Sequence, residues 1–93
     1  MTWTIEYAAS IHKKLRKADP QTRRRIRNFL EERLLQQDDP RQLGRPLTGR
    51  FATLWRYRVG DHHILCEIQD HRLCVLVVRI AHRRDAYQGT IES

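Results

Sequence analysis

Several residue types used in phosphate chemistry follow one another at the end of an apolar run. Residues 73–80 are rich in β-branched side chains, as a buried strand is, and they lead into Ala81-His82-Arg83-Arg84-Asp85-Ala86-Tyr87. Histidine transfers protons near neutral pH, and the arginine fork pairs with phosphate. These residues predict a phosphate-handling site at the tip of a strand.

Three consecutive strand-like runs place further cations on one face of a predicted sheet. Side chains alternate across a strand, so Arg56 and Arg58 share a face in residues 51–59. In residues 72–81 the pattern separates two sets, Cys74, Leu76, Val78 and Ile80 against Leu73, Val75, Val77 and Arg79. With the apolar sets facing the helices, we expect the opposite face to carry Arg56, Arg58, His63, Glu67 and Arg79, with His82, Arg83 and Tyr87 near its edge.

This cluster contains the groups that RNA cleavage needs. A ribonucleotide 2′-hydroxyl can attack its own phosphate when a base takes its proton, an acid protonates the leaving 5′-oxygen and cations stabilise the transition state. Tyr87 is a candidate base or positioning group, and it could instead stack on a nucleobase or simply pack. Arg83 could bind phosphate or pair with Asp85, and His82 could transfer a proton or be an ordinary surface residue. The chemistry requires no metal or other cofactor, and the chain lacks the clustered carboxylates of a two-metal nuclease.

The composition predicts one small domain, residues 1–93, with a polyanionic partner. The chain has 18 Lys and Arg against 11 Asp and Glu, a net charge of +7, and 15 of the basic residues are Arg. An arginine-rich basic domain favours nucleic acid as that partner. No apolar run approaches the ~20 residues that span a bilayer, and no signal peptide is evident. We therefore expect a cytoplasmic protein with no membrane partner.

The order of the elements predicts an α+β domain. Residues 2–7 alternate as a strand does, two amphipathic helices meet at Asp19-Pro20, and residues 38–49 form a polar loop. Three strands joined by short hairpin turns follow. We expect a β-α-α-β-β-β chain, with a small antiparallel sheet packed on an α-helical hairpin. Cys66 and Cys74 match no zinc-ligand spacing and are expected to be buried in the core.

The helices carry most of the excess positive charge. Residues 11–36 hold nine basic and three acidic side chains. Such a surface is either a solvated helix face or a second phosphate-binding surface. The candidates for RNA binding are Arg58, Arg79, His82 and Arg84 on the strands and their tip, and Lys13, Arg16, Lys17, Arg24 and Arg27 on the helices.

Two segments resemble the RelE group of the RelE/ParE toxin superfamily. They are Leu54-Trp55-Arg56-Tyr57-Arg58-Val59-Gly60-Asp61, preceded by Gly49, and Ile80-Ala81-His82-Arg83-Arg84-Asp85-Ala86-Tyr87. The connecting segment from Asp39 to Gly49 is also similar to that group. The resemblance as a whole covers nearly the entire chain, from the first strand through Tyr87.

The resemblance implies the toxin of a type II toxin–antitoxin pair. Such toxins enter the ribosomal A site, where 16S rRNA surrounds them, and cleave mRNA. A cognate RelB-like antitoxin wraps and inhibits the toxin, and operator DNA is bound only through that complex. Carried over by position, Arg56 contacts the phosphate, Arg83 stabilises the transition state or protonates the leaving group, and Tyr87 is the base. Arg58 is a plausible neighbour.

Two positions depart from the pattern of that group. His63 stands where an arginine is usual, which replaces a permanent cation by a group with an ordinary pKa of about 6.5. Ala81 stands where a glycine is common, and it would strain the chain if that glycine requires a positive φ. His63 either weakens phosphate binding or serves as an acid or base.

The alternative functions are a ParE-like inhibitor of DNA gyrase and a weakened toxin that acts mainly as antitoxin partner and co-repressor.

Overall fold

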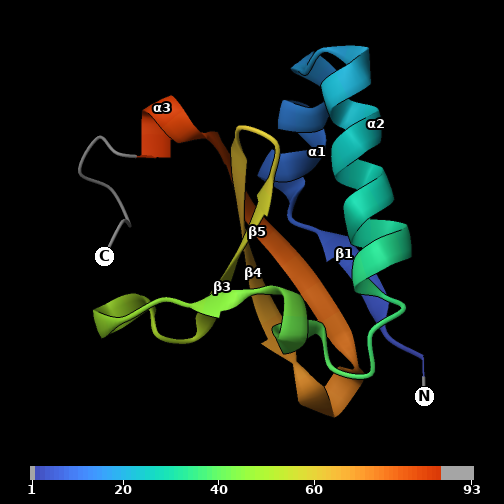
Figure 1. The fold of residues 1–93 in the computed structure, drawn as a ribbon, viewed down its shortest axis with the longest axis vertical. Helices are drawn as coiled ribbons and strands as arrows, with labels where there is room; N and C mark the ends of the chain where they lie inside the picture. Colours follow the sequence, from blue (N-terminus) through green and yellow to red (C-terminus); the bar gives the residue numbers. More distant parts are fainter. Residues whose placement is uncertain (1, 87–93) are drawn as a thin grey trace.

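A computed structural model describes residues 2–86, which form a five-stranded sheet with two helices on one face (Figure 1). The strands are β1 (Thr4–Tyr7), β2 (Arg45–Pro46), β3 (Leu54–Val59), β4 (His62–Gln69) and β5 (Cys74–His82). The helices are α1 (Ala9–Lys17), α2 (Pro20–Asn28) and the short α3 (Arg83–Ala86). The predicted α+β class and helical hairpin are confirmed.

The sheet has the order β1-β5-β4-β3-β2 and is mixed rather than wholly antiparallel. Strands β2 to β5 pair antiparallel, as predicted, but β1 lies parallel to β5, with Thr4 opposite Cys74 and Tyr7 opposite Val77. Parallel neighbours require a long crossover, which the helical hairpin and the other strands supply here. This pairing places β5, which carries the predicted site at its tip, inside the sheet.

The two helices begin and meet where their sequences predict. Asp19 caps α2, because its carboxylate accepts a hydrogen bond from the Thr22 amide at 3.0 Å, and Pro20 occupies the first turn. The Arg23 guanidinium donates to the Leu15 carbonyl at 3.2 Å and so helps to satisfy the end of α1. The sequence pattern predicts a second helix from Pro20 to about Gln37. In the structure a π-helical segment, Phe29–Leu34, continues α2, so the helical winding is wider there and ends earlier than predicted.

The core lies between the helices and one face of the sheet. The apolar helix positions Ile11, Leu15, Ile26, Leu30 and Leu34 are at most 3% exposed. They pack with Tyr57, Ile64, Cys66, Val75, Val77 and Ile80 from the strands. In β3 and β4 the alternation of side chains follows the prediction, which leaves Arg56, Arg58 and His63 on the face away from the helices.

A β-bulge in β5 corrects the predicted alternation of that strand. Leu65 pairs with Arg79 but Cys66 pairs with Val77, so Val78 is an extra residue in the ladder. Val75, Val77 and Ile80 therefore all reach the core, while Arg79 lies on the opposite face. Cys74 is a buried free thiol on that opposite face rather than in the core beside Cys66. Without the bulge, Arg79 would share the face of Val75 and Val77.

The loop before β3 is held by side chains of the sheet. The buried Tyr57 hydroxyl donates to the Pro40 carbonyl at 2.8 Å, and Arg41 pairs with Asp70 at 2.6 Å. A β-carbon at Gly44 would lie 2.7 Å from the Tyr57 ring, so only glycine fits there. This packing delivers Arg45 to β2 at the edge of β3. Among the described residues, no helix has the length and apolar character that crossing a membrane requires.

Candidate functional site

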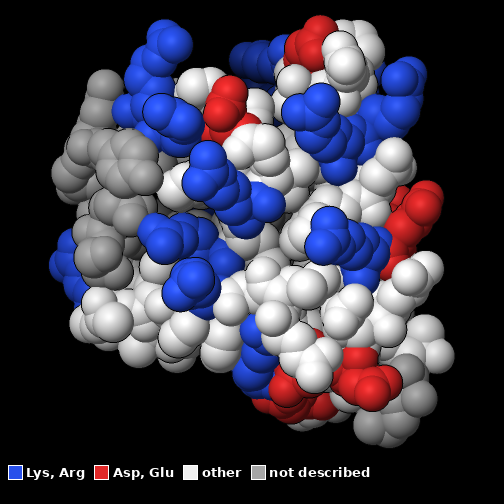
Figure 2. Space-filling view, viewed as in Figure 1, with Lys and Arg blue, Asp and Glu red and all other residues white. Residues whose placement is uncertain are grey.

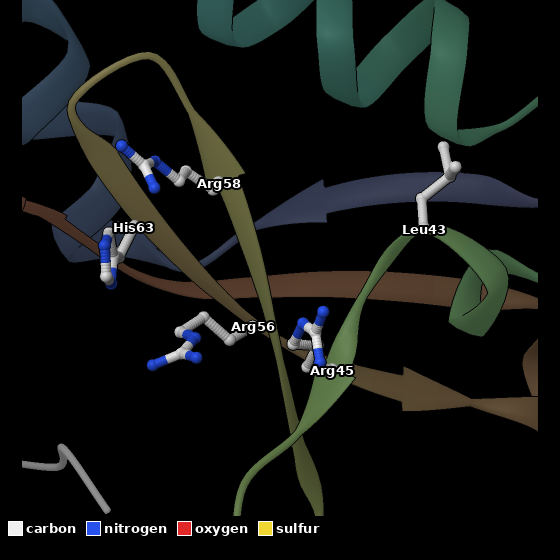
Figure 3. A pocket seen from close by; sticks show the side chains of 5 residues that line it. All are labelled: Leu43, Arg45, Arg56, Arg58 and His63. Carbon is white, nitrogen blue, oxygen red and sulfur yellow. The ribbon is translucent and has the colours of Figure 1, made fainter.

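A cavity of about 240 Å³ lies on the sheet face opposite the helices and is lined mainly by cations (Figure 3). Arg56, Arg58 and His63 line it, together with Arg45 and Leu43 from the preceding loop and β2. In Figure 3 the side chains of Arg56, Arg58 and His63 project to the same side of the β3–β4 hairpin. The structure thus brings together three of the predicted site residues.

The register of the strands sets the neighbours of each cation. Arg58 lies opposite His63, and His63 lies opposite Ala81, which forms one row across β3, β4 and β5. The next row runs from Arg45 through Arg56 and Leu65 to Arg79. Directly opposed side chains in a sheet lie about 5 Å apart. Phosphate oxygens placed in the cavity would therefore be within reach of several guanidinium groups.

His63 is the most buried polar side chain of the cavity. It is 8% exposed, whereas Arg58 is exposed and Arg56 is half-buried. Its neighbour Ala81 presents only a methyl group. A histidine held in this way can exchange a proton with a bound group while the arginines keep their charge.

Arg45 and Leu43 are site residues that the sequence reasoning missed. They lie in the segment that reads as a polar loop, where a two-residue strand leaves no periodic signal. Arg45-Pro46 offered one clue, because proline within a sheet is confined largely to edge strands. The pairing of Arg45 with Arg56 adds a cation to the cavity.

Arg83 and Arg84 line a second hollow, beyond the tip of β5, together with Asp61 and His82. The Arg83 amide donates to the Asp61 carbonyl at 2.6 Å, and its guanidinium lies 3.9 Å from the Asp61 carboxylate. The Arg84 amide donates to Nδ1 of His82 at 3.1 Å. Arg83 is thus two residues beyond Ala81, at the same end of the sheet as His63, but it does not line the cavity.

His82 lies on the helix-facing side of the sheet, which corrects its predicted place near the edge of the opposite face. It is opposite His62, and the two rings make an edge contact with centroids 5.3 Å apart. Burial, assisted by His82 and Lys14, lowers the pKa of His62, while Asp61 acts against this shift. The histidine pair therefore belongs to the packing of the hairpin rather than to the cavity.

Comparisons with known proteins identify the family. Residues 5–87 match the sequence model of the ParE toxin of the type II toxin–antitoxin system, parDE. The chain belongs to this toxin family. It is 26% identical to Toxin RelG of Mycobacterium tuberculosis over 88 residues, which covers 95% of this chain and 99% of the relative.

Solved structures share the fold of the toxin. The toxin–antitoxin complex RelBE2 of Mycobacterium tuberculosis matches with a TM-score of 0.80 at 24% identity, covering 89% of this chain and 93% of that one. A mutant of the E. coli toxin RelE in the free state matches with a TM-score of 0.72 at 13% identity, covering 92% and 88%. The RelB–RelE complex of Methanococcus jannaschii gives 0.69 at 22% identity, covering 91% and 98%.

The predicted helix cations of the toxin do not reach the cavity. Lys13, Arg16, Lys17 and Arg24 are exposed on the helical layer, which covers the other face of the sheet. Arg27 pairs with Glu31 at 3.1 Å and lies over the Tyr7 ring, so it helps to join α2 to β1. Figure 2 shows basic side chains over much of one face of the toxin, with a large acidic area at the lower edge.

Ala81 imposes no backbone strain on the toxin. Leu73 is the sole non-glycine residue with a positive φ among residues 2–86, and Ala81 lies in regular β5. The conformational freedom of a glycine is therefore not needed at position 81. Tyr87, the predicted base, lies outside the described residues.

Proposed function

We propose that this toxin is a ribosome-dependent endoribonuclease that cleaves mRNA in the ribosomal A site. The observation that carries the proposal is the cavity in which Arg45, Arg56, Arg58 and His63 converge from three strands. It combines permanent cations for a phosphate with a buried histidine for proton transfer. We assign the reaction as attack of a ribose 2′-hydroxyl on the adjacent phosphate.

The arginines supply the electrostatic part of the reaction. As the 2′-oxygen bonds to phosphorus, negative charge accumulates on the non-bridging oxygens. Guanidinium groups of Arg56 and Arg58 hold those oxygens through charge-assisted hydrogen bonds, and Arg45 adds charge from β2. Because fixed cations provide this stabilisation, the proposed step includes no metal ion.

Two proton transfers complete the step. One group takes the proton of the 2′-hydroxyl as the new oxygen–phosphorus bond forms, and another protonates the 5′-oxygen as its bond to phosphorus breaks. We assign one transfer to His63, which borders the guanidinium groups in the cavity. The resemblance to RelE assigns the other to Tyr87 or Arg83, and Arg83 follows β5 at the same end of the sheet as His63.

The ribosome supplies what the cavity lacks. The cavity is a hollow on an open sheet face, and flexible mRNA must be aligned for in-line attack. Rigid positioning of reacting groups contributes several kcal/mol, on the order of 7–11 in favourable cases. Messenger RNA held in the A site, beside 16S rRNA, is positioned in this way, and the toxin would act in the cytoplasm.

A cognate antitoxin is the expected protein partner. Several solved relatives of the same fold are complexes of RelE with the antitoxin RelB. We extend this partnership to the present toxin, with a RelB-like antitoxin that blocks the cavity and mediates any contact with operator DNA.

A second function, inhibition of DNA gyrase, is favoured by one observation. The matching family carries the name of the ParE toxin. A gyrase inhibitor would need the fold for binding and would not need a histidine in a cavity lined by arginines. The third alternative, a weakened toxin, would keep the antitoxin interface but lose cleavage because His63 replaces a permanent cation.

Expression in cells followed by mapping of mRNA 5′ ends separates these functions. The proposed nuclease gives cuts within translated codons. Intact mRNA with DNA-damage signalling would favour gyrase inhibition, and intact mRNA without toxicity would favour the weakened toxin. If Tyr87→Phe and Arg83→Ala both retain full cleavage with purified ribosomes, the roles assigned to those residues are wrong.

A further inference from the structure

A second basic groove lies between α2 and the end of β3. It encloses about 350 Å³ and is lined by Arg25, Asn28, Arg33 and Arg58 around the apolar side chains of Phe29 and Val59. We propose that this groove binds the phosphate backbone of an RNA strand that extends beyond the cavity. This inference rests on the proposed ribonuclease function and adds a binding subsite to it.

The arginines of the groove form no ion pair with a carboxylate of residues 2–86. Elsewhere in the toxin, Arg27, Arg41 and Arg72 each form an ion pair with an acidic side chain at 3.2 Å or less. Within residues 2–86, by contrast, Arg25 and Arg33 form no ion pair, and both side chains are exposed. Their charge is therefore available to an anionic ligand.

Arg58 connects the groove to the cavity. Its side chain lines both, and its Nε donates to the Gly60 carbonyl at 3.2 Å. Arg25 approaches the same turn, because a β-carbon at Gly60 would lie 3.1 Å from its Nη1. The guanidinium groups of Arg58, from the sheet, and Arg25, from α2, thus both lie beside the hairpin turn at Gly60.

The lining of the groove favours RNA over an acidic peptide. Its polar groups are guanidinium forks and one amide, which suit phosphate and nucleobase edges. Its apolar residues are recessed, since Val59 is buried and Phe29 is half-buried against the Tyr57 ring.

The test compares Arg25→Ala/Arg33→Ala with a control that removes two exposed arginines elsewhere, Arg50→Ala/Arg72→Ala. Binding is measured over a range of salt concentrations with two probes. One is a short single-stranded RNA with 2′-O-methyl groups, which the toxin cannot cleave by the proposed reaction. The other is intact ribosomes without mRNA. Neither variant alters Arg56, Arg58 or His63, so binding is separated from chemistry.

We expect the groove variant to bind more weakly than the control. The slope of log K against the logarithm of the salt concentration should be about 1.4 smaller in magnitude for the groove variant. Each phosphate contact to single-stranded RNA releases ~0.7 counterion on binding, and the variant loses two such contacts. A loss with the oligonucleotide assigns the groove to the substrate strand, and a loss with ribosomes alone assigns it to ribosomal RNA.

Two results would overturn the inference. One is that the groove variant binds both probes as tightly as the control variant does. The other is a loss of affinity seen only when a third ligand, the cognate antitoxin, is measured, which would make the groove a protein-binding site. Cleavage of mRNA on ribosomes by wild-type toxin, measured in parallel, distinguishes failure of this subsite from failure of the proposed nuclease function.

Discussion

His63 is the residue on which the proposed chemistry depends most. An arginine in its place would be charged at every physiological pH, whereas histidine has an ordinary pKa of about 6.5 and can be an acid or a base. His63 is 8% exposed and lies between Arg58 and the small Ala81. Its position suits transfer of a proton to or from an RNA oxygen held by the arginines.

Replacement of His63 should separate proton transfer from charge. We expect His63→Gln, which retains hydrogen bonding, to slow mRNA cleavage on ribosomes by about 10²–10⁴-fold. His63→Arg should also slow it, because the added charge cannot transfer a proton. Single-turnover cleavage rates measured across pH provide the comparison, with Arg72→Ala as the control. Faster cleavage by His63→Arg than by wild type would mean that histidine at this position weakens the toxin and does not transfer a proton.

His62 should make the stability of the toxin depend on pH. Burial and His82 lower its pKa in the folded state, so folding favours the neutral ring. This contribution is present above the unfolded pKa of about 6.5 and is lost as pH falls through the lower folded pKa. Wild-type toxin should therefore lose more stability between about pH 7.5 and about pH 5 than His62→Gln does. Urea midpoints at both pH values measure this difference, and equal losses would exclude the role of His62.

At the scale of the elements, the sequence predicts most of the fold. Period-two patterns in β3 and β4 and helical patterns in α1 and α2 assign the faces correctly because each element buries one side. The bulge at Val78 is not predictable from alternation, since one extra residue reverses every side chain that follows. The side of the sheet occupied by His82 does follow from alternation, since His82 lies two residues beyond the core residue Ile80.

The cavity could be predicted only in part. Arg56, Arg58 and His63 lie on adjacent strands joined by a short turn, so their shared face follows from the pattern. Arg45 reaches them through contacts between residues distant in sequence, including the Tyr57–Pro40 hydrogen bond. Such long-range contacts leave no recognisable pattern in the sequence around Arg45.

Gly44 should be essential for the loop that carries Arg45. An alanine methyl group would lie 2.7 Å from the Tyr57 ring, and the buried ring has no space to move. We expect Gly44→Ala to lower the free energy of unfolding by about 1–3 kcal/mol, as overpacked sites do. Chemical denaturation measures the change. Tyr57→Leu is itself destabilising, but it removes the ring that the alanine methyl group would meet. In the Tyr57→Leu background, Gly44→Ala should therefore lower the free energy of unfolding much less than it does in the wild type. An equal loss in both backgrounds would show that the clash with the ring is not the cause.

At the scale of the whole molecule, the basic residues that give the net charge of +7 have different roles. Arg23, Arg27, Arg41 and Arg72 bind carbonyl or carboxylate groups within the toxin. The cavity and the basic groove hold arginines that face solvent across the β3–β4 hairpin. Composition alone predicts a polyanionic partner, but the fold separates the cations that pair within the toxin from those that line the cavity and the basic groove.

The most direct test of the proposed function uses purified ribosomes programmed with one defined mRNA. The 5′ ends of the mRNA are mapped after addition of wild-type toxin, Arg56→Ala or the control Arg72→Ala. We predict a cut within the A-site codon for wild type and control, and a rate lower by about 10²–10³-fold for Arg56→Ala, since it lacks one group that stabilises the transition state. Intact mRNA with wild-type toxin, or equal cleavage by Arg56→Ala and the control, would contradict the account.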